Sequence, residues 1–147
     1  MASIILPKKL GDKLREKAEE AGYLPEELAV ELLHNDLNEK SEKYLAEAKE
    51  LLKKGDLVQA SEKFWGAAAL TVKMLAAKRG QTLEQHGALW AFVSRLARAT
   101  GDKAIISSFS EANSLHKNFY ENELTREVVE KMAEDVKQLI TKLKEVE

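Results

Sequence analysis

Residues 56–80, DLVQASEKFWGAAALTVKMLAAKRG, decide the fold that the sequence predicts. Asp56 begins the stretch and Gln59 follows three residues later, the spacing of a capping box that satisfies free N–H groups at a helix start. Gly80 ends it, because glycine readily takes the left-handed conformation found at helix C-termini. Between these ends, apolar and small residues recur on one broad face at helical spacing: Leu57, Ala60, Phe64, Ala67, Ala68, Thr71 and Leu75. The stretch therefore predicts one long helix with a buried face.

Similar signals on both sides of this stretch predict further helices. Upstream, Gly55 follows a helix whose last turn holds lysines, which suit the negative end of the helix dipole. Downstream, Thr82 with Gln85 repeats the capping-box spacing, Gly101 supplies a stop and Thr125 supplies another cap. The expected helices are residues 39–54, 82–100, 102–121 and 125 to the C-terminus. The four long helices from residue 56 to the C-terminus, joined by short loops, predict an all-α fold with an antiparallel four-helix bundle.

The N-terminal residues allow two interpretations. Pro7 and Pro25 stand where short helices over residues 7–20 and 25–37 would begin, since proline suits the first helical turn. We therefore expect an N-terminal helical hairpin over residues 1–38 and the helical bundle over residues 39–147. In the second interpretation SIIL (residues 3–6) is a short strand of a ribbon-helix-helix module, which places strand side chains in the major groove of DNA.

Composition restricts the function classes. The chain has 147 residues, enough for one domain with a small appendage, and no cysteine, which excludes disulfides and thiolate metal sites. Its 25 acidic and 23 basic residues give a formal net charge of -2, which argues against broad electrostatic binding of nucleic acid. No signal peptide or membrane span is predicted, so a cytoplasmic location is expected.

Residues 109–124, FSEANSLHKNFYENEL, contain the main candidate site. At 100° per residue, His116 falls within an otherwise apolar stripe, Tyr120 lies at its edge and Glu123 returns to the same face. One interpretation is a half-buried histidine that packs on Phe119 or Phe64, with Tyr120 or Glu123 as its hydrogen-bond partner. The other is the edge of a nucleotide or RNA site. The candidate ligand-binding set is His116, Tyr120, Glu123, Asn113, Lys78 and Arg79, with His116 catalytic only if the protein is a ribonuclease.

A second histidine, His86, has Trp90 four residues later on the same helix face. Such a pair either stacks a base or packs in the core. The three histidines show none of the spacings of a zinc site, and no phosphate-binding glycine loop is present. We therefore predict no metal and no cofactor.

From Asn38 onward the chain resembles the archaeal PaREP family of the HEPN superfamily (higher eukaryotes and prokaryotes nucleotide-binding). The resemblance rests on residues 45–80, on HGALWAFVSRLARATGD (86–102) and on the 109–124 stretch, and LPKKLGDKLREKAEEAGYLPEELAVELL looks like the family's helical N-terminal segment. It implies a HEPN-like four-helix bundle, usually dimeric. Many HEPN proteins are metal-independent ribonucleases or toxins partnered by a nucleotidyltransferase.

The ribonuclease motif of the HEPN superfamily is incomplete in this chain. The motif consists of an arginine, then four to six residues, then a histidine. His116 matches the histidine, but the three positions open to the arginine hold Phe109, Ser110 and Glu111. Losing one donor to the transition state costs about 3 kcal/mol or more, unless a partner subunit supplies Lys78 or Arg79.

Three functions follow as expectations. The first is a binding or regulatory module that contacts a nucleotide, an RNA or a protein partner as a homodimer. The alternatives are a metal-independent ribonuclease or toxin that uses His116, and a purely structural dimer.

Overall fold

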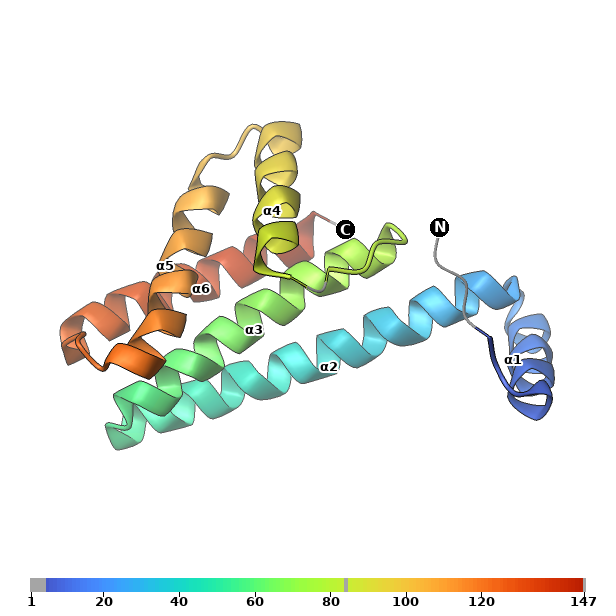
Figure 1. Ribbon diagram of the computed structural model, residues 1–147, viewed down its shortest axis with the longest axis horizontal. Helices are drawn as coiled ribbons and strands as arrows, with labels where there is room; N and C mark the ends of the chain where they lie inside the picture. Colours follow the sequence, from blue (N-terminus) through green and yellow to red (C-terminus); the bar gives the residue numbers. More distant parts are fainter. Residues whose placement is uncertain (1–4, 84, 147) are drawn as a thin grey trace.

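The computed structural model describes residues 5–83 and 85–146, and these residues form helices and connecting loops without a strand (Figure 1). The predicted all-α helical bundle is confirmed. The helices are α1 (Lys8–Ala21), α2 (Pro25–Lys54), α3 (Leu57–Lys78), α4 (His86–Thr100), α5 (Ala104–Glu121) and α6 (Arg126–Glu145).

Helix α3 is the centre of the bundle. It packs along α2 and also contacts α4, α5 and α6 (Figure 1). Small side chains such as Ala60, Ala67 and Ala68 are fully buried on α3 and let the neighbouring helices approach closely. Phe64, Phe92 and Phe109 fill the space between the helices. Thus the 56–80 stretch does form the central helix, and its broad apolar face is the core.

Local caps define several helix ends as predicted. Asp56 Oδ1 accepts the N–H of Gln59 at 3.1 Å, and Thr125 Oγ1 accepts the N–H of Val128 at 3.4 Å. Gly55 ends α2 with φ 86° and Gly101 ends α4 with φ 70°, both in the left-handed region. These ends depend on residues close in the sequence, which is why the sequence predicts them.

The predicted break between helices 25–37 and 39–54 is wrong, because α2 is continuous across the expected boundary at residue 38. No glycine or proline interrupts the chain there. Packing on α3 also holds this part of α2 in place. The buried hydroxyl of Ser41 lies 2.7 Å from that of Thr71 and donates to the carbonyl of Ala67 at 3.1 Å. The hydrogen bonds join α2 to α3 just after the expected break.

The predicted start of α4 at Thr82 is also wrong. The helix begins at His86, with Gln85 as its N-terminal flanking residue. After α3 the N–H of Gln81 donates to the carbonyl of Ala76 at 2.8 Å, which turns the chain back. Leu83 then buries its side chain in the core. Burial of Leu83 keeps this segment out of the helix, against the local capping signal.

The strand of the ribbon-helix-helix interpretation falls partly on residues 1–4, which lie outside the described residues. Ile5 and Leu6 belong to no strand and are exposed. Helices α1 and α2 follow and contact each other, and Ala18 of α1 is buried.

An interior glycine of α3 has a packing role. A Cβ atom at Gly66 would lie 2.7 Å from Cδ2 of Tyr44, whose ring packs over the glycine from α2. The Nζ of Lys63 lies 4.4 Å from the centre of the same ring and 2.9 Å from a carboxylate oxygen of Glu47. The absence of a side chain at Gly66 therefore lets α2 and α3 pack closely.

Within the described ranges, no helix combines the length and apolar character that crossing a lipid bilayer requires.

Candidate functional site

Three helices bring four aromatic rings together at one side of the bundle. Trp65 comes from α3, His86 from the first residue of α4, and His116 with Tyr120 from α5. Ring centres are 5.1 Å apart for Trp65 and His86, 5.1 Å for Trp65 and His116, and 5.3 Å for the two histidines. Their planes are within 30° of parallel, since the three interplanar angles are 11°, 29° and 28°. We call these four residues the ring cluster.

Tyr120 completes the ring cluster from the solvent side. Its ring meets that of His116 edge to face, with centres 5.5 Å apart and planes at 86°. Offset-stacked and edge-to-face pairs at such distances are the favourable arrangements of aromatic rings. The ring cluster is therefore held by its own contacts as well as by the bundle.

A carboxylate orients the central histidine. Oε2 of Glu62 on α3 lies 2.9 Å from Nδ1 of His116. An ionised carboxylate only accepts hydrogen bonds, so Nδ1–H is the donor and Nε2 is left as the nitrogen that can exchange a proton with a ligand. Glu62 precedes Trp65 by three residues, which places both side chains on one face of α3.

Exposure increases across the ring cluster from the core to the surface. Trp65 is 6% exposed, the His116 side chain 22%, the Glu62 side chain 31% and Tyr120 73%. His86 lies on the exposed side as well. A flat ligand approaching from solvent therefore meets Tyr120 and the two imidazoles, while Trp65 supports them from below.

The contacts expected for His116 are only partly those observed. Its ring packs on Trp65 and His86, whereas Phe119 or Phe64 was predicted, and its hydrogen-bond partner is Glu62, whereas Tyr120 or Glu123 was predicted. The reason is tertiary, because α3 and α4 present these residues across the face of α5. The contact with Tyr120 does occur, through the ring edges.

Glu123 does not join the ring cluster, because α5 ends before it. Asn122 adopts a left-handed conformation, φ 47°, and the exposed Glu123 lies in the loop that follows. Its N–H and that of Leu124 each donate to Oδ1 of Asn118 at 2.9 Å.

Asn118 is the residue that sequence reasoning missed in this region. It is 2% exposed, and its Nδ2 donates to Oγ of Ser61 at 3.1 Å. It therefore fastens the loop between α5 and α6 to α3. No sequence signal indicates this role, since its partner Ser61 is 57 residues away.

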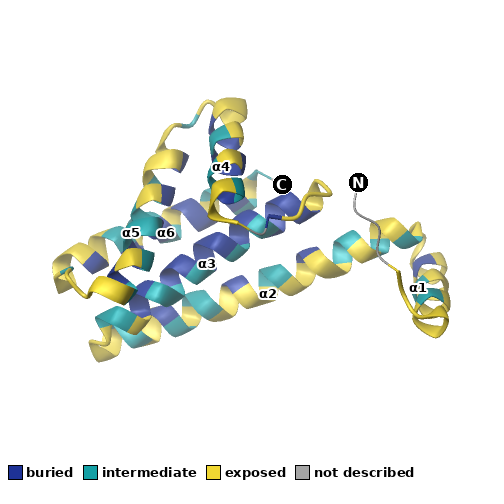
Figure 2. Cartoon of the chain, viewed as in Figure 1, coloured by how far each residue is buried: buried dark blue, intermediate teal, exposed yellow. Residues whose placement is uncertain are grey.

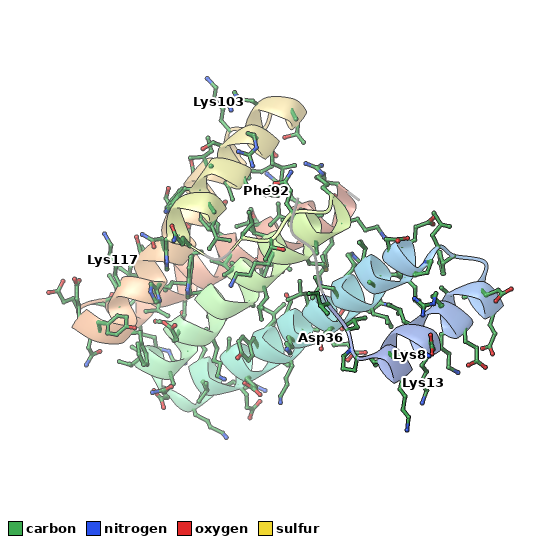
Figure 3. All side chains as sticks on the ribbon, turned by 45° about the vertical axis from the view of Figure 1, so that its right-hand side comes forward. Lys8, Lys13, Asp36, Phe92, Lys103 and Lys117 are labelled. Atoms are coloured by element: carbon green, nitrogen blue, oxygen red, sulfur yellow. The ribbon has the colours of Figure 1, made fainter. Side chains whose placement is uncertain are left out.

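Lys78 and Arg79 lie away from His116 within one chain. They follow Trp65 on the central helix by 13 and 14 residues, which corresponds to about 20 Å along the axis. Lys78 Nζ pairs with Glu31 at 3.5 Å, and the Arg79 guanidinium lies 5.6 Å from the centre of the Phe92 ring. Asn113 is half-buried on α5, three residues before His116. Lys117, next to His116, is exposed at the edge of the molecule (Figure 3).

The predicted pairing of His86 with Trp90 is not the contact that forms. Trp90 meets Phe109 edge to face at 4.8 Å and packs against the core. His86 turns to Trp65 and His116. Of this pair, Trp90 is thus a core residue and His86 is a member of the ring cluster.

A second group of titratable side chains lies between α5 and α6. Burial raises the pKa of Glu111 to about 7, and the neighbouring Asp135 adds to this effect while Lys131 opposes it. Hydrogen bonding to Glu111 and Lys131 lowers the pKa of Asp135. Lys131 Nζ donates to both carboxylate oxygens of Asp135, at 2.8 and 2.9 Å. The proton of this carboxyl pair therefore resides on Glu111.

Among the described residues, no three histidine, aspartate or glutamate side chains are grouped closely enough to hold a metal ion.

Fold and site together define an all-α helical bundle with a carboxylate-oriented histidine in an aromatic cluster. The model of the archaeal PaREP1/PaREP8 family matches residues 36–140, more than half of the chain. The chain therefore belongs to this family.

A solved structure has a similar fold. The crystal structure of a protein from Sulfolobus solfataricus is similar to this chain, with a TM-score of 0.62 and 31% sequence identity over 71% of this chain and 92% of the other. Comparison with curated proteins gave no match. The family match begins inside α2, so helix α1 and the first third of α2 lie outside it.

Proposed function

We propose that this protein is a binding module for single-stranded RNA or a nucleotide, with the ring cluster as its base-stacking surface. The observation that carries the proposal is the arrangement of Trp65, His86 and His116 as three nearly parallel rings with centres 5.1 to 5.3 Å apart. Bases stack on aromatic side chains with about 1–3 kcal/mol per base, whatever their sequence.

Each member of the ring cluster has a distinct part in the proposal. Tyr120, the most exposed ring, adds stacking surface at the rim. His116 offers Nε2 to a base edge or a sugar hydroxyl, because Glu62 occupies Nδ1. Trp65 is nearly buried and keeps the imidazoles in place. A ligand held in this way is recognised by its flat base and by one polar contact.

Charge has a small part in the proposed binding. The formal net charge is -2, and Lys78 and Arg79, two cations of the predicted ligand set, make contacts elsewhere on the chain. Few phosphates would then be neutralised, so affinity rests on stacking and depends weakly on salt. Such a site suits short unpaired RNA or mononucleotides better than a long duplex.

Other expectations belong with this proposal. A small helical RNA-binding module would fit the HEPN superfamily and a cytoplasmic location. It would also fit a homodimeric state and a regulatory role beside a nucleotidyltransferase-type partner.

The second candidate function is metal-independent RNA cleavage, which the proximity of two imidazoles favours. Nε2 of His116 would take the proton of a ribose 2′-hydroxyl, and that oxygen would attack the adjacent phosphorus. The bond to the 5′-oxygen would break, and His86 would donate a proton to the leaving oxygen. The cation that would stabilise charge on the phosphate is missing at positions 109, 110 and 111, where the motif would place it, so this reaction would be slow.

Fluorescence of Trp65 tests the proposal directly. In Trp90→Phe, Trp65 is the only tryptophan. Oligouridine, oligoadenosine and single nucleotides that stack on His86 and His116 should quench its fluorescence, because both imidazoles contact the Trp65 ring. His116→Gln keeps a hydrogen-bond donor toward Glu62 but removes the imidazole, so it should weaken binding. No quenching and no binding to labelled RNA at millimolar ligand would reject the binding proposal and favour a purely structural dimer.

Cleavage is scored in the same samples by adding a chelator and analysing the RNA on a gel. Products that require both His86 and His116 would support the second candidate. Binding without products would support the first.

A further inference from the structure

Exposed apolar side chains gather in the N-terminal part of the molecule. We call residues 5–38 the N-terminal arm; it comprises α1 and the first half of α2. Of ten large hydrophobic side chains exposed among the described residues, seven lie in it: Ile5, Leu6, Leu10, Tyr23, Leu24, Leu32 and Leu33. Figure 1 shows α2 extending beyond the rest of the bundle with α1 at its far end, and Figure 2 shows that the arm is mostly exposed.

The exposed leucines lie on a face of α2 that the bundle does not cover. Leu24 immediately precedes α2, and Leu28 and Leu32 follow at four-residue spacing, so the three leucines continue one stripe along the helix. Ser41, which packs on α3, follows Leu32 by nine residues, or 180° around the helix. Leu24 is 62% exposed and Leu32 54%, although each belongs to a regular apolar stripe.

Charges in the arm are separated along the chain. Residues 8–17 carry five basic side chains and two acidic ones, whereas residues 18–31 carry five acidic side chains and no basic one. Thus α1 begins strongly basic and α2 begins with the acidic residues Glu26 and Glu27. Figure 3 shows Lys8 and Lys13 on α1 at the edge of the molecule.

We propose that a second copy of this chain docks on the N-terminal arm. The basic start of α1 in one protomer lies beside the acidic start of α2 in the other, and the leucine stripes pack between them. A two-fold axis forms each such contact twice, because residues of one patch meet the same patch on the partner. The inference does not depend on RNA binding, and the surface lies almost wholly before the matched family region at residue 36.

Charge favours this occupant over a nucleic acid. The arm holds eight acidic against five basic residues, so phosphates would be repelled overall. A second copy, in contrast, supplies a basic segment for every acidic one. The arm is thus complementary to itself.

Sedimentation equilibrium of the full chain, up to about 200 µM, tests the proposal because dimers dissociate on dilution. Wild type should sediment as a dimer. Lys9→Glu with Lys13→Glu makes the start of α1 acidic like the start of α2, and Glu26→Lys with Glu27→Lys makes the start of α2 basic like the start of α1. Each should weaken its own dimer by about tenfold or more. An equimolar mixture of the two should form a heterodimer near wild-type affinity, since both contacts again join opposite charges.

Leu32→Asp should also abolish the dimer, while Val128→Asp is the matched control, since Val128 is an exposed apolar residue on α6. Circular dichroism of each variant checks that the bundle remains folded. Any of three results would overturn the proposal. The wild type could be monomeric, the dimer could survive both charge exchanges, or the two charge-exchanged chains could stay apart on mixing.

Discussion

The imidazole of His86 lies 5.3 Å, centre to centre, from that of His116, with the two planes 28° from parallel. The two residues are 30 positions apart, at the first residue of α4 and near the end of α5. Trp65 contacts both rings at 5.1 Å and thereby joins them to the core. This pair makes the ring cluster a better candidate site than His116 alone, because a ligand contacts two imidazoles at once.

Tyr120→Ala should weaken binding of a short labelled RNA by about fivefold to tenfold, which corresponds to about 1 kcal/mol of lost stacking. The fold should remain intact, since the ring is 73% exposed. Fluorescence polarisation measures the affinity. Tyr23→Ala is the control, a 43% exposed tyrosine outside the ring cluster. Equal affinities for the two variants would remove Tyr120 from the site.

Salt should change the RNA affinity only slightly. If about one phosphate is neutralised, the logarithm of the association constant falls with the logarithm of salt concentration with a slope near -0.7. Titrations at several potassium chloride concentrations give this slope. A slope steeper than about -3 would mean that several lysines or arginines contact the backbone, against the stacking mechanism.

Asn118→Ala should destabilise the fold by about 2–3 kcal/mol, because it leaves the N–H groups of Glu123 and Leu124 without their acceptor. Urea unfolding followed by circular dichroism measures the change.

Asn113→Ala, on the same helix but half-buried, is the control for this prediction and should cost about 0.5 kcal/mol or less. An equal effect of the alanine substitutions at positions 113 and 118 would contradict the proposed role of Asn118 in fastening the loop.

Gly66→Ala should destabilise the protein by about 1 kcal/mol, even though alanine favours helices more than glycine does. The added Cβ would lie 2.7 Å from Cδ2 of Tyr44 and force the ring to move. Thermal unfolding measures the effect. Gly87→Ala has open space around its Cβ and should instead be neutral or stabilising. In a Tyr44→Ala background the cost at Gly66 should disappear, and its persistence there would refute this explanation.

Stability should fall as the pH rises from about 4.5 to about 7, because of Glu111. Its pKa is raised from 4.5 to about 7 in the folded protein, so across this range the folded state keeps a proton that the unfolded state has lost. The stabilisation that Glu111 contributes is complete below the pKa of its carboxyl in the unfolded state. It is lost as the pH rises through the pKa of the folded state. Asp135, with its lowered pKa, acts oppositely and only at more acidic pH.

Glu111→Gln tests this pH dependence. Since solvent reduces the effect of a partly exposed group, we expect the variant to be more stable than wild type at about pH 8 by about 1 kcal/mol. Urea unfolding at a series of pH values measures the slope. In the variant, the free energy of unfolding should no longer decline between about pH 4.5 and 7. An unchanged decline would mean that other titratable groups cause it.

Local signals in the sequence determined most helix ends. Asp56 and Thr125 each cap a helix through a backbone N–H three residues later, and Gly55 and Gly101 end helices through their own left-handed conformation. Since these interactions need no distant partner, the sequence predicts them. The apolar face of 56–80 likewise predicts the central helix, because the bundle buries whichever face of α3 is apolar.

Only the tertiary structure decided two helix boundaries and the contacts of the candidate site. Packing on α3 keeps α2 continuous past residue 38, and burial of Leu83 delays α4 to His86. The partner of His116 is Glu62, 54 residues away on another helix. Periodicity tells which residues share a face of one helix, but it carries no information on which face of another helix lies opposite. The site depends on that pairing, because its rings and its carboxylate come from three helices.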